Sequence, residues 1–140
     1  GGSVKIGSLG QKRVGANTLG KEAKLLMGFA KPVEKYEVGA FRDLEKRSVR
    51  GDGLDIHHVV QSNPGGQVIA QYDRLSAPSI ALLAGEHRLI PTIKGPYDES
   101  ARSLLAKDIS DLRNFTNAPN SSLRQLIELN KQTYPMIFVK

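Results

Sequence analysis

Two adjacent histidines, His57 and His58, stand out in a sequence that contains only three. They lie in the stretch GDGLDIHHVVQ of residues 51–61, and Asp55 precedes the first of them by two positions. The third, His87, follows 29 residues after His58. Neutral imidazole binds metal ions, and its ordinary pKa of about 6.5 also suits proton transfer near neutral pH. The pair therefore indicates either shared chemistry or two polar side chains that are adjacent by chance.

The elements around the histidines decide whether they can act together. Residues 54–60 are rich in apolar and β-branched side chains and predict a strand. Adjacent residues on a regular strand point to opposite faces, so the pair can share a target only where the strand ends or bulges. The Asn-Pro-Gly-Gly sequence within QSNPGGQ predicts such an end and a loop. A second strand is predicted near 79–83, and a helix that begins near Glu86 would bring His87 to the same place.

The rest of the chain predicts an α+β domain. A short helix at 21–30, a strand near 34–41 and a helical turn or two at 41–48 precede the histidine pair. Two amphipathic helices follow the second strand, at about 98–115 and 117–134, the latter with Asn120 or Ser121 as its cap. On the first of these helices we expect Asp108 and Asp111 on the solvent face. We predict a flexible arm or linker over residues 1–20 and one domain over residues 21–140.

The charge and composition of the chain limit the kinds of molecule that it is expected to bind. The chain has a net charge of +6 and no cysteine, which excludes disulfides and thiolate metal sites. Residues 1–50 carry eleven basic and five acidic side chains, residues 51–100 carry three and six, and residues 101–140 carry six and three. Basic flanks suit a polyanion such as nucleic acid, and an acidic centre suits a bound cation. No stretch is long and apolar enough to predict a membrane segment.

A strand ending in His-His, a long loop, a second strand and a helix with a further histidine together resemble the HNH and endonuclease VII group of nucleases, the His-Me finger fold. The wider sequence, from GDGLDIHHVVQ through AGEHRLIPTIKG to TNAP, looks like nuclease toxin domains of Rhs-type polymorphic toxins, and the resemblance covers roughly residues 36–135. The resemblance implies a core of two strands and a helix around a metal ion (a ββα-metal core), with additional flanking helices.

The family's roles can be transferred position by position. The resemblance implies that His57 and His87 are metal ligands and that His58 is the general base. It departs from the family's pattern at Ser79, where an asparagine is common, and at Pro91, where a second histidine is common. Asp55, Ser79 and Glu86 are therefore possible accessory residues. Zn, Ni and Mg all remain open as the divalent ion. Phosphates could be held by three cations near the motif, namely Arg74, Arg88 and Lys94.

The resemblance implies a metal-dependent endonuclease that hydrolyses DNA, the carboxyl-terminal toxin of an Rhs-type secreted effector that acts in the cytoplasm of a target cell. Its expected partners are nucleic acid, with DNA preferred and RNA possible, and a cognate immunity protein, which the positive charge of the chain predicts to be acidic. Two alternatives stay open. One is a metal-independent RNase toxin that uses His58 and His87 as an acid–base pair, and the other is a binding module without enzymatic activity.

Overall fold

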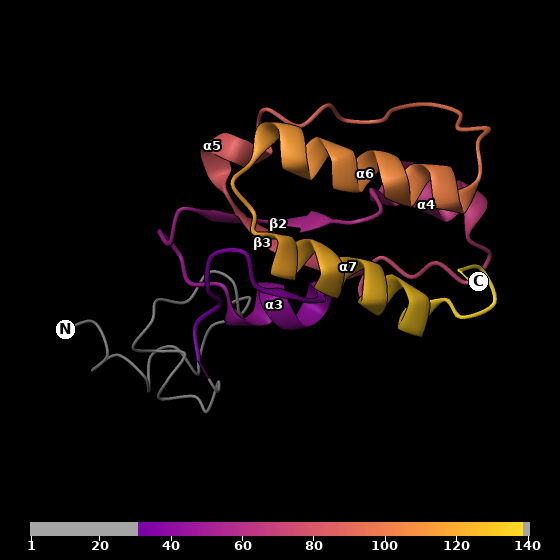
Figure 1. Cartoon of the computed structure of the whole chain (residues 1–140). Coiled ribbons are helices and arrows are strands. Elements are labelled where there is room, and N and C mark those ends of the chain that lie inside the picture. The colour runs from indigo at the N-terminus through magenta and orange to yellow at the C-terminus, as the bar shows by residue number, and fades with distance from the viewer. Residues whose placement is uncertain (1–30, 139–140) are drawn as a thin grey trace.

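Three short strands form an antiparallel sheet in the part of the chain that the computed structural model describes, residues 31–138 (Figure 1). The strands are β1 (Val38–Ala40), β2 (Leu54–His58) and β3 (Pro78–Leu83), and their order is β1-β3-β2. Strand β3 is therefore central, and β2, which holds the histidine pair, lies at an edge. The predicted arm at 1–20 and the predicted helix at 21–30 lie outside the described residues.

Five helices complete the described fold, which confirms the predicted α+β class. Successive apolar side chains of β3 point to opposite faces of the sheet, and helices pack on both faces. Ile80 and Leu82 pack in the main core with leucines of α6 and α7, whereas Ala81 packs on the other face with Leu44 of α3. The helices are α3 (Phe41–Arg47), α4 (Ser62–Val68), α5 (Ala84–His87), α6 (Ala101–Phe115) and α7 (Asn120–Thr133). None of the helices in residues 31–138 combines the length and the apolar character that crossing a membrane requires.

The predicted loop at QSNPGGQ is wrong, because most of it forms helix α4. Proline is tolerated in the first turn of a helix, where the backbone N–H that it lacks has no partner within the helix. Pro64 is the third residue of α4 and satisfies this condition. Gly65 permits a close approach, since a Cβ there would lie 2.9 Å from both Tyr72 and Val60. Gly65 therefore serves packing rather than a turn.

Two predictions for the carboxyl-terminal helices are also wrong. Asp108 and Asp111 were expected on the solvent face of α6 but are buried, with 1% and 8% of their surface exposed. The Asp108 carboxylate accepts a hydrogen bond from the Gln61 backbone N–H at 2.8 Å, and Asp111 pairs with Lys107 at 2.8 Å. Helix α7 has Pro119 at its N-cap position, and neither Asn120 nor Ser121 caps it.

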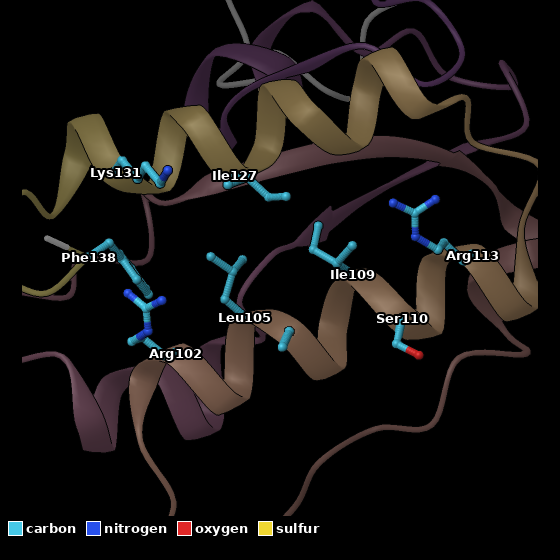
Figure 2. Close-up of a pocket in the computed structure, with 9 residues that line it drawn as sticks. Arg102, Leu105, Ile109, Ser110, Arg113, Ile127, Lys131 and Phe138 are labelled. Atoms are coloured by element: carbon cyan, nitrogen blue, oxygen red, sulfur yellow. The ribbon is translucent and has the colours of Figure 1, made fainter. Parts of the chain in front are cut away.

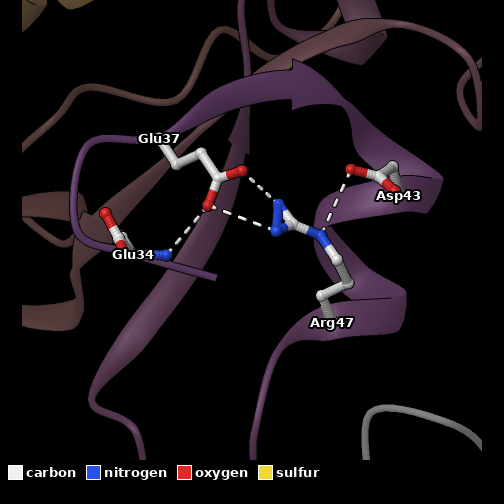
Figure 3. A network of polar contacts seen from close by, with 4 residues as sticks. All are labelled: Glu34, Glu37, Asp43 and Arg47. Atoms are coloured by element: carbon white, nitrogen blue, oxygen red, sulfur yellow. Dashed lines mark hydrogen bonds and ion pairs between the residues drawn. The ribbon is translucent and has the colours of Figure 1, made fainter. Parts of the chain in front are cut away.

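A buried arginine ties α3 to the segment that leads into β1 (Figure 3). The Arg47 guanidinium pairs with the carboxylate of Glu37, and its Nε lies 3.4 Å from a carboxylate oxygen of Asp43. The Glu34 backbone N–H donates to the same Glu37 side chain at 3.0 Å. Because α3 supplies one wall of the pocket described below, this network helps to fix that wall.

We expect Arg47→Ala to lower the free energy of unfolding by about 1–3 kcal/mol, because the partly buried Glu37 carboxylate loses its charged partner. The measurement is urea unfolding at neutral pH. Arg42→Ala is a matched control, since Arg42 is an exposed arginine on the same helix and its loss should change stability by less than about 0.5 kcal/mol. Equal effects of the two substitutions would show that the network does not stabilise the fold.

Candidate functional site

The three histidines converge on one pocket of about 360 Å³, which we call the histidine pocket. His57, His58 and His87 all line it, and the ring centroids of His57 and His87 are 5.0 Å apart with their planes at 62°. Residues from α3, β2, α4, α5, the segment between α4 and β3 and the segment after α5 form its walls. The convergence predicted from the sequence therefore occurs.

The position of the pair at the end of an edge strand explains how neighbours can share one pocket. His57 pairs with Ile80 across the sheet and lies on the same face as Asp55, two residues earlier. His58 pairs with Ser79 and lies on the opposite face, where its ring stacks on Phe41 of α3. Strand β2 ends at His58, so the pocket wraps around the strand terminus and reaches both faces.

Helix α5 brings His87 to the pocket directly from β3. The helix begins at Ala84, the residue after the last residue of the strand, and His87 is its final residue. It starts two residues earlier than the sequence predicts, so Gly85 lies inside the helix and does not end the strand. The short connection places the partly exposed His87 side chain against Asp55 and His57 of β2.

His57 is held as a neutral imidazole. Only 7% of its surface is exposed. Burial, with smaller contributions from the charged forms of His87 and His58, lowers the pKa of His57 from 6.5 to about 3. A neutral ring keeps the lone pair that a metal ion requires of a histidine ligand.

Asp55 orients His87. The Nδ1 atom of His87 lies 2.8 Å from a carboxylate oxygen of Asp55, and donation from Nδ1 leaves Nε2 as the acceptor in the neutral ring. Histidines that bind metals commonly donate their second ring nitrogen to a carboxylate in this way. The sequence suggested that Asp55 could itself be a metal ligand. In the structure its carboxylate instead forms a hydrogen bond with His87.

The separation of the two imidazoles, which are in edge-to-face contact, is one that two ligands of a shared ion can have. Rings whose nitrogens bind one metal at about 2.0–2.1 Å have centroids about 5 Å apart, and the His57–His87 separation is 5.0 Å. Within residues 31–138, no group of three or more histidine, aspartate or glutamate side chains is arranged to hold a metal. Water or substrate oxygens would therefore supply the remaining ligands.

His58 has a different set of contacts, which suit a base rather than a ligand. Its Nε2 lies 3.0 Å from the Arg74 carbonyl oxygen, which can only accept, so Nε2 carries the hydrogen and Nδ1 holds the lone pair. The ring stacks on Phe41 with centroids 4.2 Å apart and planes at 15°. Burial lowers the pKa of His58, and the hydrogen bond to Arg74 opposes that shift. The ring is thus held neutral and in one tautomer at neutral pH.

Of the three cations predicted to hold phosphate, the structure brings Arg74 to the histidine pocket. Its guanidinium lies 4.7 Å from the Phe41 ring centroid, on the aromatic ring that also supports His58. Arg88 and Lys94 are not among the residues that line the pocket. Arg88 instead forms the C-cap of α5.

Two predicted accessory residues also lie elsewhere. Ser79 is fully buried, and its hydroxyl donates to the Ala77 carbonyl at 3.2 Å. The Glu86 carboxylate accepts from the Tyr36 hydroxyl at 2.8 Å and from the Asn117 backbone N–H at 2.9 Å. Glu86 therefore joins α5 to the segment before β1 and to the α6–α7 connection, away from the histidines.

The backbone after the histidine pair is held by buried polar side chains that sequence reasoning missed. Asn130 of α7 donates to the Val59 carbonyl at 2.8 Å, and Asp108 of α6 accepts from the Gln61 N–H at 2.8 Å. The Gln61 side chain in turn donates to the Pro91 carbonyl and accepts from the Ile93 N–H, both at 2.9 Å. These bonds fix the end of β2 relative to α6, α7 and the far wall of the pocket.

A signal for two of these residues is present in the sequence. Asp108 follows Leu104 by four positions, and Asn130 follows Leu126 by four, so each lies on the buried stripe of its helix. A polar residue on such a stripe must find a hydrogen-bond partner inside the protein.

The buried Asp108 gives stability a predicted pH dependence. Burial, partly opposed by the hydrogen bond from Gln61, raises the pKa of Asp108 to about 7. Between about pH 4 and about pH 7, the folded protein therefore keeps a proton on Asp108 that the unfolded chain has released. This bound proton stabilises the folded state, and the stabilisation is lost as pH rises through about 7. Asp108→Asn keeps an acceptor oxygen and should abolish this loss. The stability advantage of the variant over the parent should grow from about pH 4 to about pH 8 in urea unfolding; a constant difference would show that Asp108 does not titrate in this range.

The site can thus be described from its own geometry: two imidazoles with ring centroids 5.0 Å apart, a third imidazole held by a backbone carbonyl, and an arginine on the same wall. Comparisons of the chain with protein-family models, with curated proteins and with solved structures found no match.

Proposed function

We propose that this protein is a metal-dependent endonuclease that hydrolyses phosphodiester bonds of DNA, with His57 and His87 as metal ligands and His58 as the general base. The observation that supports this most strongly is the convergence of all three histidines of the sequence on one pocket, in which His58 and His87 have different hydrogen-bond partners. Strands β2 and β3 followed by helix α5 also include the elements expected for a ββα-metal core, with α4 between the two strands where a loop was expected.

The contacts of His58 support its role as base. Because Nε2 donates to the Arg74 carbonyl, Nδ1 is the atom that can accept a proton from water. The oxygen of that water forms a bond to phosphorus, and the bond between phosphorus and the 3′ oxygen breaks. A divalent ion at His57 and His87, when bound, would stabilise the negative charge that develops on the phosphoryl group and the leaving oxygen.

Arg74 is the group best placed to bind the phosphate of the substrate. Its guanidinium presents several donors to phosphate oxygens, and its stacking on Phe41 restricts its orientation. The net charge of +6 adds a general attraction for nucleic acid, which should weaken as salt concentration rises. The resemblance to toxin domains further supports a role as a secreted antibacterial effector domain that acts in the cytoplasm of a target cell and is neutralised by an immunity protein.

A metal-independent RNase is the second candidate, and one observation favours it. The Asp55–His87 hydrogen bond orients His87 as a carboxylate orients a catalytic histidine, and His87 and His58 line the same pocket. In that case the two histidines would act as an acid–base pair on RNA.

A cleavage assay with a chelator separates these functions. The purified chain is incubated with supercoiled plasmid or with structured RNA, with and without EDTA, and then with added Zn, Ni or Mg. We expect EDTA to abolish plasmid nicking and an added divalent ion to restore it. RNA cleavage that persists in EDTA would favour the second candidate. The absence of cleavage of either substrate in all metals would support a binding module without enzymatic activity.

Asp55→Asn should weaken metal binding by about 10–100-fold, since loss of the carboxylate removes the partner that orients His87. The measurement is calorimetric titration of the parent and the variant with Zn. Asp98→Asn is the matched control, because Asp98 is an exposed aspartate outside the pocket. Unchanged affinity in Asp55→Asn would show that the hydrogen bond does not support a ligand.

A further inference from the structure

A second and larger hollow, of about 520 Å³, lies between α6 and α7 (Figure 2). We call it the α6–α7 groove. Its apolar lining comes from both helices and from the residues after α7: Leu105 and Ile109 point from α6 toward α7, Ile127 lies on α7, and Phe138 closes one end. Leu105, Ile109 and Phe138 are buried and form the floor of the groove, whereas Ile127 is partly buried. It belongs to a different part of the molecule from the histidine pocket, and the two share no lining residue.

The charged residues that line the groove are all cations, namely Arg102, Arg113 and Lys131, and all three are exposed. They lie at both ends of the apolar strip. Figure 2 shows Arg102 and Lys131 near Phe138 at one end and Arg113 at the other. Arg102 and Arg113 are 11 residues apart on α6, which corresponds to about 16 Å along the helix axis.

The charge of this chain argues against its own segments as the occupant. Residues 1–30, which lie outside the described range, contain five basic side chains and one acidic side chain, a net charge of +4. A second copy of the whole chain, at +6, would likewise bring positive charge to a positive rim. Like charges across an interface disfavour association, so an acidic partner is the better match.

Because cations lie at both ends of the groove, some kinds of acidic ligand fit it better than others. A fatty acid or a similar amphiphile has one charged end and would reach the cations at only one end of the groove. An amphipathic helix can present an apolar stripe with acidic residues before and after it, and such helices commonly bind in grooves between helices. Three turns of helix cover the distance between the two ends.

We infer that the α6–α7 groove binds an acidic amphipathic helix of a partner protein, whose apolar face packs on Leu105, Ile109, Ile127 and Phe138 and whose acidic residues pair with the cations at both ends. The inference is independent of the nuclease proposal, because it involves no residue of the histidine pocket.

Designed peptides of about 15 residues test the inference directly, since this length spans the groove. One peptide has leucines at helical spacing on one face and glutamates near both ends, and its counterpart has lysines in place of the glutamates. Binding to the full chain is measured by fluorescence anisotropy at low and high salt. We expect the glutamate peptide to bind at least about tenfold more tightly than the lysine peptide, with a difference that shrinks at high salt.

A charge-reversed protein locates the binding. Arg113→Glu combined with Lys131→Glu should abolish the preference for the glutamate peptide or reverse it, whereas Arg124→Glu, an exposed arginine of α7 outside the groove, should leave it unchanged. Circular dichroism checks that each variant keeps the helical content of the parent.

Three results would overturn the inference. The two peptides could bind with equal affinity, or neither could bind. The second result would also follow if residues of the chain itself filled the groove. Laurate could bind in place of the glutamate peptide and displace it. The control and the double variant could also lose binding equally, which would place the peptide elsewhere on the surface.

Discussion

His58→Ala should reduce the rate of plasmid nicking by about 10²–10⁴-fold at saturating metal, with metal affinity little changed. The reason is that the proposed ligands His57 and His87 remain, and only the acceptor of the water proton is lost. Added imidazole should restore part of the lost rate, because a free imidazole can enter the space left by the side chain and accept the proton.

The stacking of His58 on Phe41 requires a second variant as a control. Alanine removes both the base and the stacking contact, whereas His58→Phe retains an aromatic ring and lacks a nitrogen. Equal losses of rate in the two variants would identify proton transfer as the function that is lost. A rate in His58→Ala that matches the parent, or a loss in His58→Ala that His58→Phe repairs, contradicts the proposed role as base.

The pH dependence of the parent gives an independent check on the same residue. A base must be unprotonated, so the rate should fall when pH drops through the pKa of His58. Burial lowers that pKa below its ordinary 6.5, so the acid limb should lie below pH 6.5. Metal affinity must be measured at each pH, because acid also protonates metal ligands. The residual activity of His58→Ala should lack the limb.

The second large effect is expected at the two proposed ligands. His57→Ala and His87→Ala should each lower the nicking rate by about 10³-fold or more, since a bound ion contributes several kcal/mol of transition-state stabilisation. In contrast to His58→Ala, both should also weaken the binding of Zn, as measured by calorimetry. Thr92→Ala is the matched control, because Thr92 lines the same pocket but lies outside the histidine cluster.

His57 is buried, so its replacement can also affect folding. His57→Gln, which fills more of the space than alanine does, distinguishes the two effects. A variant that melts with the parent's cooperativity yet no longer binds Zn supports a ligand. A variant that binds Zn with unchanged affinity removes His57 from the proposed metal site, and a variant that loses only stability assigns the residue to the core.

The sequence predicted the strands and the helices around the histidines because each has a periodic local pattern. The apolar and β-branched content of LDIHHVV and the helical spacing of Leu104, Leu105, Ile109 and Leu112 are properties of neighbouring residues. The end of β2 and the meeting of His57 with His87 followed from the same local reasoning combined with the resemblance.

What could not be predicted depends on contacts between distant residues. Helix α4 was missed because Pro-Gly-Gly favours a turn locally, whereas Gly65 packs closely against Tyr72, a contact that spacing does not reveal. Asp108 was assigned to the surface because aspartate is rarely buried, and the Gln61 N–H that compensates its burial lies 47 residues earlier. The partners of Ser79 and Glu86 could not be read from spacing either, since tertiary contacts determine them.

The hydrogen bonds to Val59 and Gln61 have a consequence for the time at which the histidine pocket forms during synthesis. The residues that hold this backbone lie 47 and 71 positions later in the chain. Contacts of such long sequence separation form late, because a long loop must close before they are gained. A nascent chain that has emerged only as far as residue 100 contains all three histidines but neither Asp108 nor Asn130. The pocket is therefore completed only when α6 and α7 have left the ribosome and packed on the sheet.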